Sequence, residues 1–440
     1  MNAVVIAVVL MLALSVARMH VMLAMIIAAF VGGLVGGLDL NTTIAAFNKG
    51  IGGGAGIALS YAMLGGFAVA ISLSGLPNLL ADAILKRLGV ETIQYQKLLK
   101  SLLLGLLLMA AIFSQNLIPI HIAFIPILIP PLLMVMARLN LDRRLVACVL
   151  TFGLITPYMF LPVGFGNIYL HEILLGRIAQ AGMDVQGLSV VKAMFIPALG
   201  MLFGLLVAMF FSYRKPRQYN VAAIKFTERT EGSDYDKKSL YVAAVAVVVT
   251  FATQLYTDSM VLGAMAGFLV FSVTGVIKSH KSEDVLGDGI KMMASIGFIM
   301  ISAQGFAEVM TQTGHIDLLV EESAAWLADS KGLAAFVLLL VGLLLTLGIG
   351  SSFSTVPIIA AIYVPLCLQM GFSPLAIVSL VGTAGVLGDA GSPASDSTLG
   401  PTAGLNVDGQ HNHMRDTVVP TFLHYNLPLM LFGWVAAMVL

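Results

Sequence analysis

The chain has 440 residues, of which 59% are hydrophobic and 10% are charged, and its formal net charge is +0. Soluble globular proteins carry about 25% charged residues, so this composition excludes a soluble protein and indicates a chain that lives in a lipid bilayer. The two cysteines, Cys148 and Cys367, both lie in apolar segments. They therefore support neither a disulfide framework nor a thiolate metal site.

A membrane-spanning helix needs roughly 20 mostly apolar residues, and ten stretches of the chain meet this requirement. They are residues 2–17, 20–38, 52–74, 143–163, 190–212, 239–256, 259–277, 289–312, 373–394 and 417–439. The first stretch has no basic segment before it and no convincing cleavage site, so we interpret it as a retained helix and not as a signal peptide. The expected fold class is an all-α integral membrane protein with about ten transmembrane helices.

Residues 214–238 form the longest clearly polar stretch of the chain. Five candidate spans precede this stretch and five follow it, so we interpret it as a linker between two halves. The expected organisation is a first repeat over residues 1–213, the linker over 214–238, and a second repeat over 239–440.

The two halves resemble each other, because residues 47–80 align with residues 286–319 without a gap. The matched positions include three pairs of glycines, Gly50 with Gly289, Gly66 with Gly305 and Gly75 with Gly314. Each copy continues into a stretch with apolar residues at i, i+3, i+4 and i+7. This spacing predicts a helix that lies in the plane of the membrane surface.

Each half then contains two apolar arms around a short polar tip, within residues 97–137 and 332–371. The first tip holds Ser114, Gln115 and Asn116, and the second holds Ser351, Ser352, Ser354 and Thr355. Neither tip carries a Lys or Arg that would anchor it at the membrane surface. We therefore predict two re-entrant hairpins, one from the cytoplasmic side and one from the outer side. A pair of full spans is the alternative.

The span after each hairpin is interrupted by glycine and proline, most clearly in the sequence VLGDAGSPASDSTLG. Such residues free backbone groups that lipid cannot satisfy, so the interruption is tolerated only where protein or a wet cavity covers it. Four polar residues, Asp389, Ser392, Ser395 and Asp396, lie at this second interruption, and Thr156 and Asn167 lie at the first. An intramembrane carboxylate is a functional hypothesis because burying it unpaired costs about 3 kcal/mol. The alternative for Asp396 is a helix cap or a loop position.

Two further titratable residues are candidate sites for a proton or a substrate ammonium group. Glu308 lies within a predicted span, and its counterpart in the first half is Val69. His121 lies in the first hairpin and could relay protons, although a structural histidine is the alternative. The histidines of HE (171–172) and HNH (411–413) lack the HExxH spacing of a zinc site, so no such metal is expected.

Lysine and arginine set the predicted orientation. If the hairpins return to their entry face, most of these residues, including those of the linker, fall on one side. That side should be cytoplasmic, which puts both termini outside a bacterial-type inner membrane. Since each half has an odd number of spans, the second half enters the membrane inverted relative to the first.

Inverted repeats with broken helices are the physical basis of alternating access in secondary transporters. Helix N-termini bind anions, while freed backbone carbonyls and hydroxyls can replace the hydration shell of Na⁺. The candidate Na⁺ ligands are Asp389, Ser352, Ser354 and Thr355.

No GxxxxGK[ST] loop for ATP occurs, and no cofactor other than Na⁺ or H⁺ as coupling ion is expected. An intramembrane aspartyl protease would carry GxGD where this chain reads GVLGD, so no enzyme is predicted. A channel would not require an inverted pair of broken helices.

The architecture resembles the ion transporter superfamily, which includes the dicarboxylate/sodium symporters and the NhaC and ArsB type proteins. Within it, residues 388–426 (GDAGSPASDSTLGPTAGLNVDGQHNHMRDTVVPTFLHYN) are similar to the Na⁺/H⁺ antiporter family. Some members of that family are considered amino-acid permeases. The resemblance implies an ion-coupled transporter.

The function we predict is Na⁺- or H⁺-coupled uptake of an amino acid or a similar small zwitterion. No Lys or Arg lies in the predicted membrane core, which argues against a heavily charged anion, and Asp389 or Glu308 could hold the ammonium end of a zwitterion. The alternative is Na⁺/H⁺ exchange. The expected partners are the bilayer, the solute and its coupling ion, and no nucleic acid. The solute, the choice of ion, symport or antiport, and the oligomeric state stay open, with a homodimer as one option.

Overall fold

The computed structural model describes residues 2–17, 19–75, 93–116, 124–224, 237–257, 259–278, 281–316, 318, 330–350 and 352–440. The regular secondary structure of these residues is helical. In the first half the helices are α1 (Ala3–Val16), α2 (Val21–Val35), α3 (Leu40–Leu73), α5 (Ile93–Asn116), α6 (Phe124–Arg138), α7 (Arg143–Phe160), α8 (Phe165–Asn167), η2 (Ile168–Leu175), α9 (Gly176–Gln180), α10 (Val190–Val207) and η3 (Ala208–Ser212). A short turn of helix, η4 (Val221–Ala223), follows in the linker.

In the second half the helices are α11 (Lys237–Thr257), α12 (Met260–Val273), α13 (Ser282–Gln312), α15 (Lys331–Ile349), α16 (Ser352–Gln369), α17 (Pro374–Gly391), α18 (Asp396–Leu405), η7 (His413–Val418), α19 (Val419–Thr421), η8 (Phe422–Asn426) and α20 (Leu427–Val439). Every span predicted from the sequence coincides with one or more of these helices. The four predicted hairpin arms correspond to α5, α6, α15 and α16.

By length and composition, eight helical segments of the described chain can cross a membrane. They are Gly54–Ile71, Gln96–Ser114, Arg143–Phe160, Val190–Ser212, Lys237–Thr257, Lys331–Gly348, Pro374–Leu405 and His413–Val439. Five shorter apolar helices accompany them. The protein is therefore an all-α, multi-pass membrane protein, as the composition predicts.

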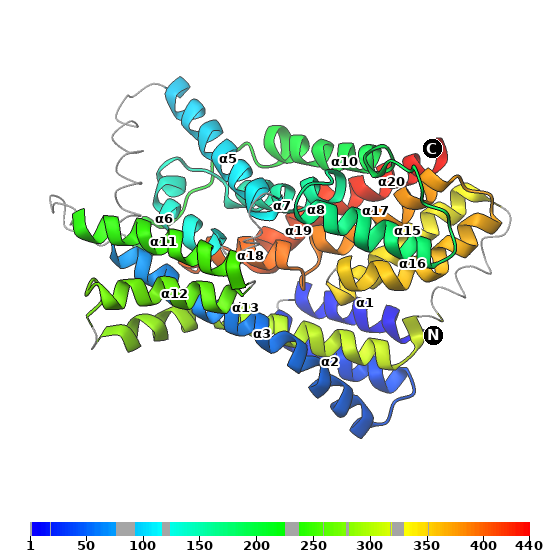
Figure 1. The fold of residues 1–440 in the computed structure, drawn as a ribbon, viewed down its shortest axis with the longest axis horizontal. Helices are drawn as coiled ribbons and strands as arrows, with labels where there is room; N and C mark the ends of the chain where they lie inside the picture. Colours follow the sequence, from blue (N-terminus) through cyan, green and yellow to red (C-terminus); the bar gives the residue numbers. More distant parts are fainter. Residues whose placement is uncertain are drawn as a thin grey trace.

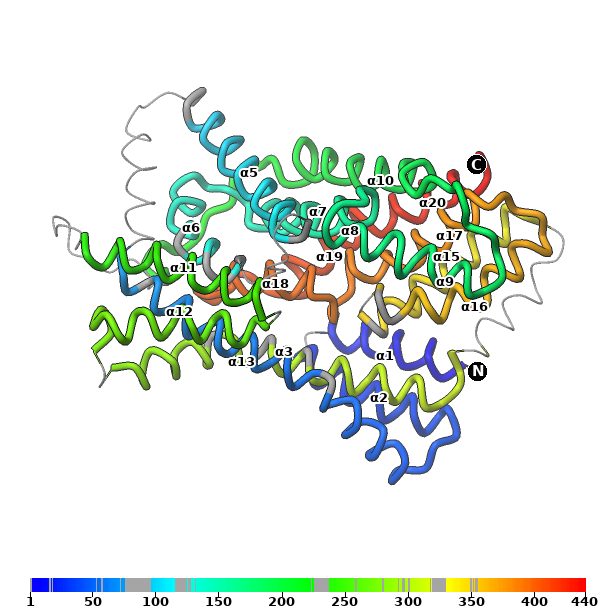
Figure 2. Tube along the Cα trace, in the orientation of Figure 1, coloured from blue at the N-terminus to red at the C-terminus, as the bar shows by residue number. Residues whose placement is uncertain are grey.

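The helices form two bundles, which Figure 1 shows one below the other. The lower bundle combines α1, α2 and α3 with α11, α12 and α13, so it takes the first helices of both halves. The upper bundle contains the hairpin arms, the interrupted spans, α10 and α20. Figure 2 follows the same division along the Cα trace, with blue and yellow-green segments below and cyan to red segments above. Each bundle is thus built from both halves of the chain.

The centre of the lower bundle is the pair α3 and α13, which pack closely along their lengths. A Cβ at Gly50 would collide with the backbone of Gly305 on α13, and a Cβ at Gly289 would collide with the backbone of Gly66 on α3. These are the glycines that the sequence alignment matches. The two contacts are reciprocal, as expected for two copies related by a twofold axis. The boundaries of the repeats stay a prediction.

Both interrupted spans are broken where glycine and proline predict. In the second half α17 ends at Gly391 and α18 begins at Asp396. In the first half α7 ends at Phe160, and the chain resumes at α8 after Gly164. Gly164 has φ 57° and ψ −125°, a backbone conformation that only glycine adopts readily. The second break places irregular backbone inside the upper bundle, whereas Leu161 and Val163 of the first break are exposed.

The second hairpin turns at Gly350, which has φ 72° and ends α15 in the left-handed conformation. A Cβ at Gly350 would lie 2.9 Å from that of Ala394, in the break between α17 and α18. The tip of this hairpin therefore rests on the second break. The tip of the first hairpin continues into residues 117–123, which lie outside the described residues, as does His121. That the hairpins are re-entrant stays a prediction.

Candidate functional site

The carboxylate of Asp389 lies where three helices meet. Asp389 is in the last turn of α17 and is 9% exposed. Its Oδ1 accepts a hydrogen bond from the backbone N–H of Ser352, at 3.2 Å, and its Oδ2 accepts one from the hydroxyl of Tyr158. The Tyr158 hydroxyl also lies 3.4 Å from the hydroxyl of Ser352. The site therefore joins α7 of the first half to α16 and α17 of the second.

The start of α16 explains why a carboxylate is stable at this place. The first N–H groups of a helix have no partner within the helix, and the helix dipole puts a partial positive charge there. Ser352 is the first residue of α16, and its N–H points at Asp389. The tip of the hairpin therefore provides a hydrogen bond and a favourable field for a negative charge.

Asp396 is a second carboxylate at the same break. It begins α18, whose N-cap is Ser395, so the capping function proposed as an alternative for Asp396 is served by its neighbour. Oδ1 of Asp396 is buried and has no hydrogen-bond partner among the described residues. The carboxylate lies close enough to Asp389 and to Tyr61 of α3 for electrostatic interaction. Asp396 therefore adds negative charge and an available oxygen to the site.

Neither carboxylate has a cationic side chain as a partner. The ion pairs of the described residues involve Glu308, Asp408, Asp142, Asp416 and Asp288, and none includes Asp389 or Asp396. A buried charge without a counter-charge is costly, and such groups in membrane proteins mark ion and proton sites. The electrostatics of the break therefore favour a cation or a proton over an anion.

The two serines of the break hold its backbone in place. The Ser392 hydroxyl donates to the carbonyl of Leu347, at 3.0 Å, and so ties the break to α15. The Ser395 hydroxyl donates to the carbonyl of Asp389, at 2.9 Å. Both hydroxyls thus hold the backbone of the break, and a role for these serines in binding stays a prediction.

The remaining predicted site residues lie in different surroundings. Thr355 is fully buried in the first turn of α16, and Thr156 is buried in α7 with a hydroxyl that has no partner among the described residues. Asn167 is exposed, and its Oδ1 lies 2.8 Å from Nδ1 of His171. Ser114 is buried and donates to the carbonyl of Ala111. The side chains of Gln115, Asn116 and Ser354 lie outside the described residues.

Glu308 belongs to the lower bundle and is paired with Lys49, at 2.7 Å, across α13 and α3. The Glu308 side chain is 25% exposed and that of Lys49 is 73% exposed. The negative charge of Glu308 therefore already has a counter-charge, unlike the carboxylates at the break.

Tyr158 is a site residue that the sequence analysis missed. An aromatic residue in an apolar run looks like part of the core, and only its position between Pro157 and the break at 161–164 could have pointed to it. The structure shows that its hydroxyl is the contribution of α7 to the Asp389 site.

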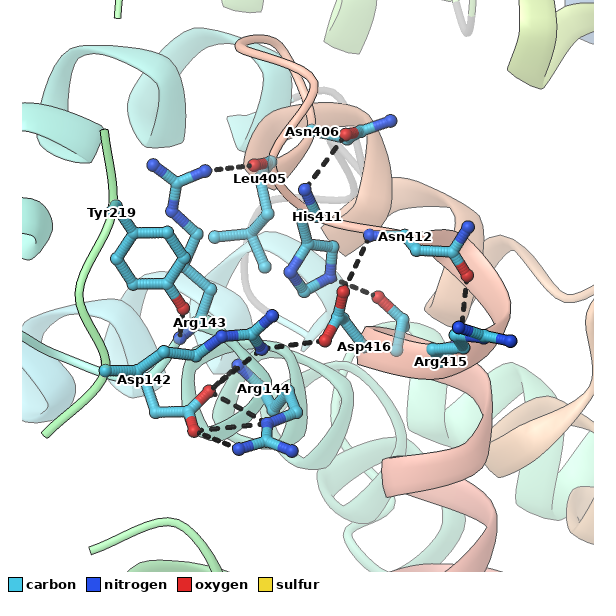
Figure 3. Close-up of polar contacts among 12 residues, drawn as sticks. Asp142, Arg143, Arg144, Tyr219, Leu405, Asn406, His411, Asn412, Arg415 and Asp416 are labelled. Carbon is cyan, nitrogen blue, oxygen red and sulfur yellow. Dashed lines mark hydrogen bonds and ion pairs between the residues drawn. The ribbon is translucent and has the colours of Figure 1, made fainter. Parts of the chain in front are cut away.

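The burial of Arg143 is a second feature that the sequence did not reveal. Arg143 is fully buried at the start of α7, and it forms two hydrogen bonds of 2.7 Å to Asp408. It also donates to the carbonyl of Leu405 at the end of α18, as Figure 3 shows. The interior of the protein therefore does contain an arginine, at the end of a span. Burial alone would raise the pKa of the Asp408 carboxyl, but the hydrogen bonds and charge of Arg143 outweigh burial, and the pKa is lowered.

The linker joins this ionic cluster. Arg217 pairs with Asp416 at 2.7 Å and lies 3.7 Å from Asp142, and the ring of Tyr219 stacks under Arg143. Figure 3 shows these side chains converging from α7, from the linker and from the segment after α18. The start of the linker is thus bound to the start of α7 and to η7, which follows α18.

Comparison with known proteins gives the family. The sequence profile of the Na⁺/H⁺ antiporter family matches residues 149–434, and that of a second family described as Na⁺-H⁺ antiporters matches residues 2–88. The chain is 58% identical to an uncharacterized membrane protein of Vibrio parahaemolyticus over 100% of both chains. It is 51% identical to an uncharacterized membrane protein of Haemophilus influenzae, over 92% of this chain and 91% of the other.

It is also 51% identical, over 100% of both chains, to YuiF of Bacillus subtilis, which is named as a candidate amino acid transporter. Among solved structures, the chain is similar to the YdaH transporter of Alcanivorax borkumensis, with 16% identity, a TM-score of 0.38, and coverage of 90% of this chain and 87% of the other. It is also similar to MtrF of Neisseria gonorrhoeae, with 14% identity, a TM-score of 0.42, and coverage of 95% and 94%.

The helical membrane fold and the matched family define a secondary transporter, and not an enzyme. The chain belongs to the Na⁺/H⁺ antiporter family. The family predicted from residues 388–426 is confirmed. Membership of this family implies Na⁺ or H⁺ as the coupling ion.

Proposed function

We propose that a gradient of Na⁺ or H⁺ drives this transporter through Asp389, and that its solute is an amino acid or a similar small zwitterion. The observation that carries the proposal is the position of Asp389, which is buried against the start of α16 and has no cationic side chain as a partner among the described residues.

The charge balance of the break supports cation binding. Two carboxylates lie there, and a buried carboxylate without a partner costs about 3 kcal/mol. The N–H of Ser352 and the hydroxyl of Tyr158 offset part of this cost. A bound Na⁺ or a proton supplies the missing positive charge. Because the two donors belong to α16 and α7, binding at Asp389 also changes how these helices hold α17.

The proposed Na⁺ ligands are the Asp389 carboxylate and hydroxyls at the start of α16. Ser352 and Thr355 are both buried there, and Ser354 is a further candidate from the sequence. A proton on Asp389 would remove the charge that attracts Na⁺, so the two ions compete for one site. This competition would suit either symport or exchange.

An amino acid is a suitable solute for the polar groups of the site that are not assigned to the ion. The unpartnered oxygen of Asp396 can accept hydrogen bonds from an ammonium group, and the buried hydroxyl of Thr156 is a further polar contact. The name of the Bacillus subtilis relative agrees with this class of solute. Exchange of Na⁺ for H⁺ without a solute is the second candidate, and the description of the matched family favours it.

Alternating access requires two parts that move relative to each other, and we infer that these are the two bundles. We further propose that the halves 1–213 and 239–440 are inverted in an inner membrane, with the linker cytoplasmic and both termini outside. The uneven distribution of Lys and Arg and the reciprocal glycine contacts of α3 and α13 support this arrangement.

The test is transport by the purified protein in proteoliposomes. Uptake of labelled amino acids would be measured under imposed Na⁺ and pH gradients, together with the movement of Na⁺ and H⁺ in the absence of any amino acid. Gradient-driven uptake of at least one amino acid supports the first candidate. Ion exchange without uptake supports the second, and neither activity would refute both.

The variants Asp389→Asn and Asp396→Asn form a matched pair for the site. Asp389→Asn should abolish gradient-driven transport, because an amide neither exchanges a proton nor gives full charge to Na⁺. Folding should survive, since removing an intramembrane charge generally lowers the cost of insertion. Asp396→Asn should have the smaller effect. Normal transport by the Asp389 variant beside an inactive Asp396 variant would show that Asp396 is the coupling carboxylate.

A further inference from the structure

A pocket of about 790 Å³ lies between the two bundles. Its size is in the range of sites for small organic molecules, about 300–1,000 Å³. The lower bundle contributes Met19 and His20, between α1 and α2, and Ile299 of α13. The upper bundle contributes residues between Asn406 and Val419. A molecule bound in this pocket would therefore contact both of the parts that we infer to move.

The pocket borders the second break. His413 lies on its wall, and Nε2 of His413 is 2.9 Å from the carbonyl of Pro393. Pro393 lies in the break between Asp389 and Asp396. The wall of the pocket is thus joined by one hydrogen bond to the backbone that carries the two carboxylates.

The amide oxygens of the wall already accept hydrogen bonds from the protein. Oδ1 of Asn406 accepts from the backbone N–H of His411, at 3.1 Å, and Oδ1 of Asn412 accepts from that of Arg415, at 2.9 Å. Oε1 of Gln410 accepts from a backbone N–H of the linker, at 2.7 Å. These oxygens are therefore engaged before any solute enters.

Asp416, the acidic residue of the wall, is engaged as well. Its Oδ1 accepts from Arg217, at 2.7 Å, and its Oδ2 accepts from the backbone N–H of Asn412, at 2.8 Å. The Asp416 side chain is 12% exposed. Its negative charge is balanced by Arg217, so it does not attract a cation into the pocket.

The donors of the wall are in the opposite situation. The guanidinium of Arg415 takes no part in the ion pairs of the described residues. The side-chain amino groups of Asn406 and Asn412 donate to no other described residue, and all three residues are exposed. A guanidinium matches the geometry of a carboxylate, to which it can donate two parallel hydrogen bonds. The pocket therefore presents donors and a positive charge, whereas the break presents two carboxylates.

We propose that this pocket binds the carboxylate group of the solute and that Arg415 is the residue that pairs with it. The inference rests on the proposed function and deepens it, since it gives the acidic end of an amino acid a site of its own. Asn406 and Asn412 donate further hydrogen bonds from the same segment. The carbon atoms of the solute face Met19 and Ile299 of the lower bundle.

The site also restricts the class of solute. One arginine balances one carboxylate, and a second carboxylate on the solute would enter the pocket without a counter-charge, which is costly when the group is desolvated. The pocket therefore favours amino acids with a single carboxylate. Because its walls belong to both bundles, a bound solute favours the arrangement in which both walls touch it, and so biases the movement between them.

Binding to the purified full-length protein in detergent tests the site. The compounds are labelled amino acids with one carboxylate, each compared with its amide, which keeps the ammonium group and replaces the carboxylate with a neutral group. We expect the wild type to bind the amide at least tenfold more weakly than the amino acid that it binds best. Arg415→Gln should bind this amino acid at least tenfold more weakly than the wild type does, but should bind the amide equally well.

Two further variants sharpen the test. Arg214→Gln is the matched control, because Arg214 is exposed and outside the ion pairs of the described residues but does not line the pocket. It should bind like the wild type. Asn412→Asp keeps the oxygen that caps η7 and replaces the amino group with negative charge. It should weaken binding of the amino acid at least tenfold without weakening binding of the amide.

The outcomes separate this site from the proposed function. Wild-type affinity of Arg415→Gln for the amino acid would overturn the site and leave the proposed function intact. An equal loss of amino acid and amide binding in Arg415→Gln would also overturn it, because the arginine would then act without the carboxylate. A wild-type protein that binds no amino acid would refute the solute class of the proposed function, and the site with it.

Discussion

Tyr158 of α7 donates a hydrogen bond to Asp389 of α17, and this bond connects the interrupted span of the first half to that of the second. Tyr158 is 2% exposed, and its ring packs edge-on against Tyr169 at 5.0 Å. The ring is therefore held in place by packing, while its hydroxyl serves the carboxylate. Any movement of α7 against α17 must change this bond.

The first prediction compares Tyr158→Phe with Tyr169→Phe. Both tyrosines are buried, and the Tyr169 hydroxyl donates to the carbonyl of Gly382. Loss of a hydrogen bond to a charged group costs about 1.5–3 kcal/mol, against about 1 kcal/mol for a neutral one. We expect Tyr158→Phe to reduce gradient-driven transport at least tenfold and Tyr169→Phe to leave it within a factor of two. Equal transport by the two variants would show that the hydroxyl of Tyr158 has no part in coupling.

The comparison of Asp389 and Tyr158 shows what the sequence could predict. A carboxylate beside glycine and proline in an apolar run is conspicuous, because lipid cannot satisfy either the charge or the freed backbone. A tyrosine in an apolar run is not conspicuous, because its ring can pack in any helical core. The positions of the spans and of both breaks followed from the same reasoning, since hydrophobicity and backbone breaks are local properties of the sequence.

Asn167 and Arg143 show what a local sequence pattern does not reveal. The analogy between the halves predicts Asn167 at the site, but a shared backbone course does not fix the direction of a side chain, and Asn167 lies beside His171 on an exposed surface, so its role in binding stays a prediction. Arg143 begins a predicted span, where a charge is expected at the membrane surface. Its burial depends on Asp408, a partner 265 positions away in the sequence, and no local pattern reveals such a pair.

The second prediction concerns the Arg143–Asp408 pair, whose side chains are both 0% exposed. Removing one member of a buried ion pair typically costs about 3–5 kcal/mol, because the other charge is left buried, whereas replacing both with apolar residues costs much less. Thermal unfolding in detergent should therefore show a large loss of stability for Arg143→Met and a smaller loss for Arg143→Met with Asp408→Leu. Lys291→Ala, which removes an exposed pair with Asp288, should have no measurable effect. If the double variant is as unstable as the sum of the single variants, the pair does not act as a unit.

The third prediction is a pH dependence of stability that arises at His411. Burial lowers the pKa of His411 in the folded protein, while in the unfolded chain a histidine titrates near 6.5. Below pH ~6.5 the unfolded state therefore binds more protons than the folded state, and the free energy of unfolding falls as the pH falls through this window. The melting temperature of the wild type should drop between pH 7 and 5 by more than that of His411→Gln. Parallel curves for the two proteins would mean that His411 is as easily protonated in the fold as in the unfolded chain.

The last prediction tests the contact between the hairpin tip and the break, with Gly350→Ala compared to Gly371→Ala. Both glycines have a left-handed backbone, with φ of 72° and 73°, so each substitution introduces similar strain, about 1–2 kcal/mol. Their surroundings differ. A Cβ at Gly371 would lie 3.4 Å from the flexible end of Lys331, whereas a Cβ at Gly350 would lie 2.9 Å from Cβ of Ala394 in the break. Gly350→Ala should lose more thermal stability in detergent than Gly371→Ala, because it adds the close contact with the break to the backbone strain. Only Gly350→Ala should lose most of its gradient-driven transport, because the tip is pushed away from the break and the N–H of Ser352 is moved from Asp389. Full transport by Gly350→Ala would show that the hairpin tip is not needed to hold the coupling carboxylate.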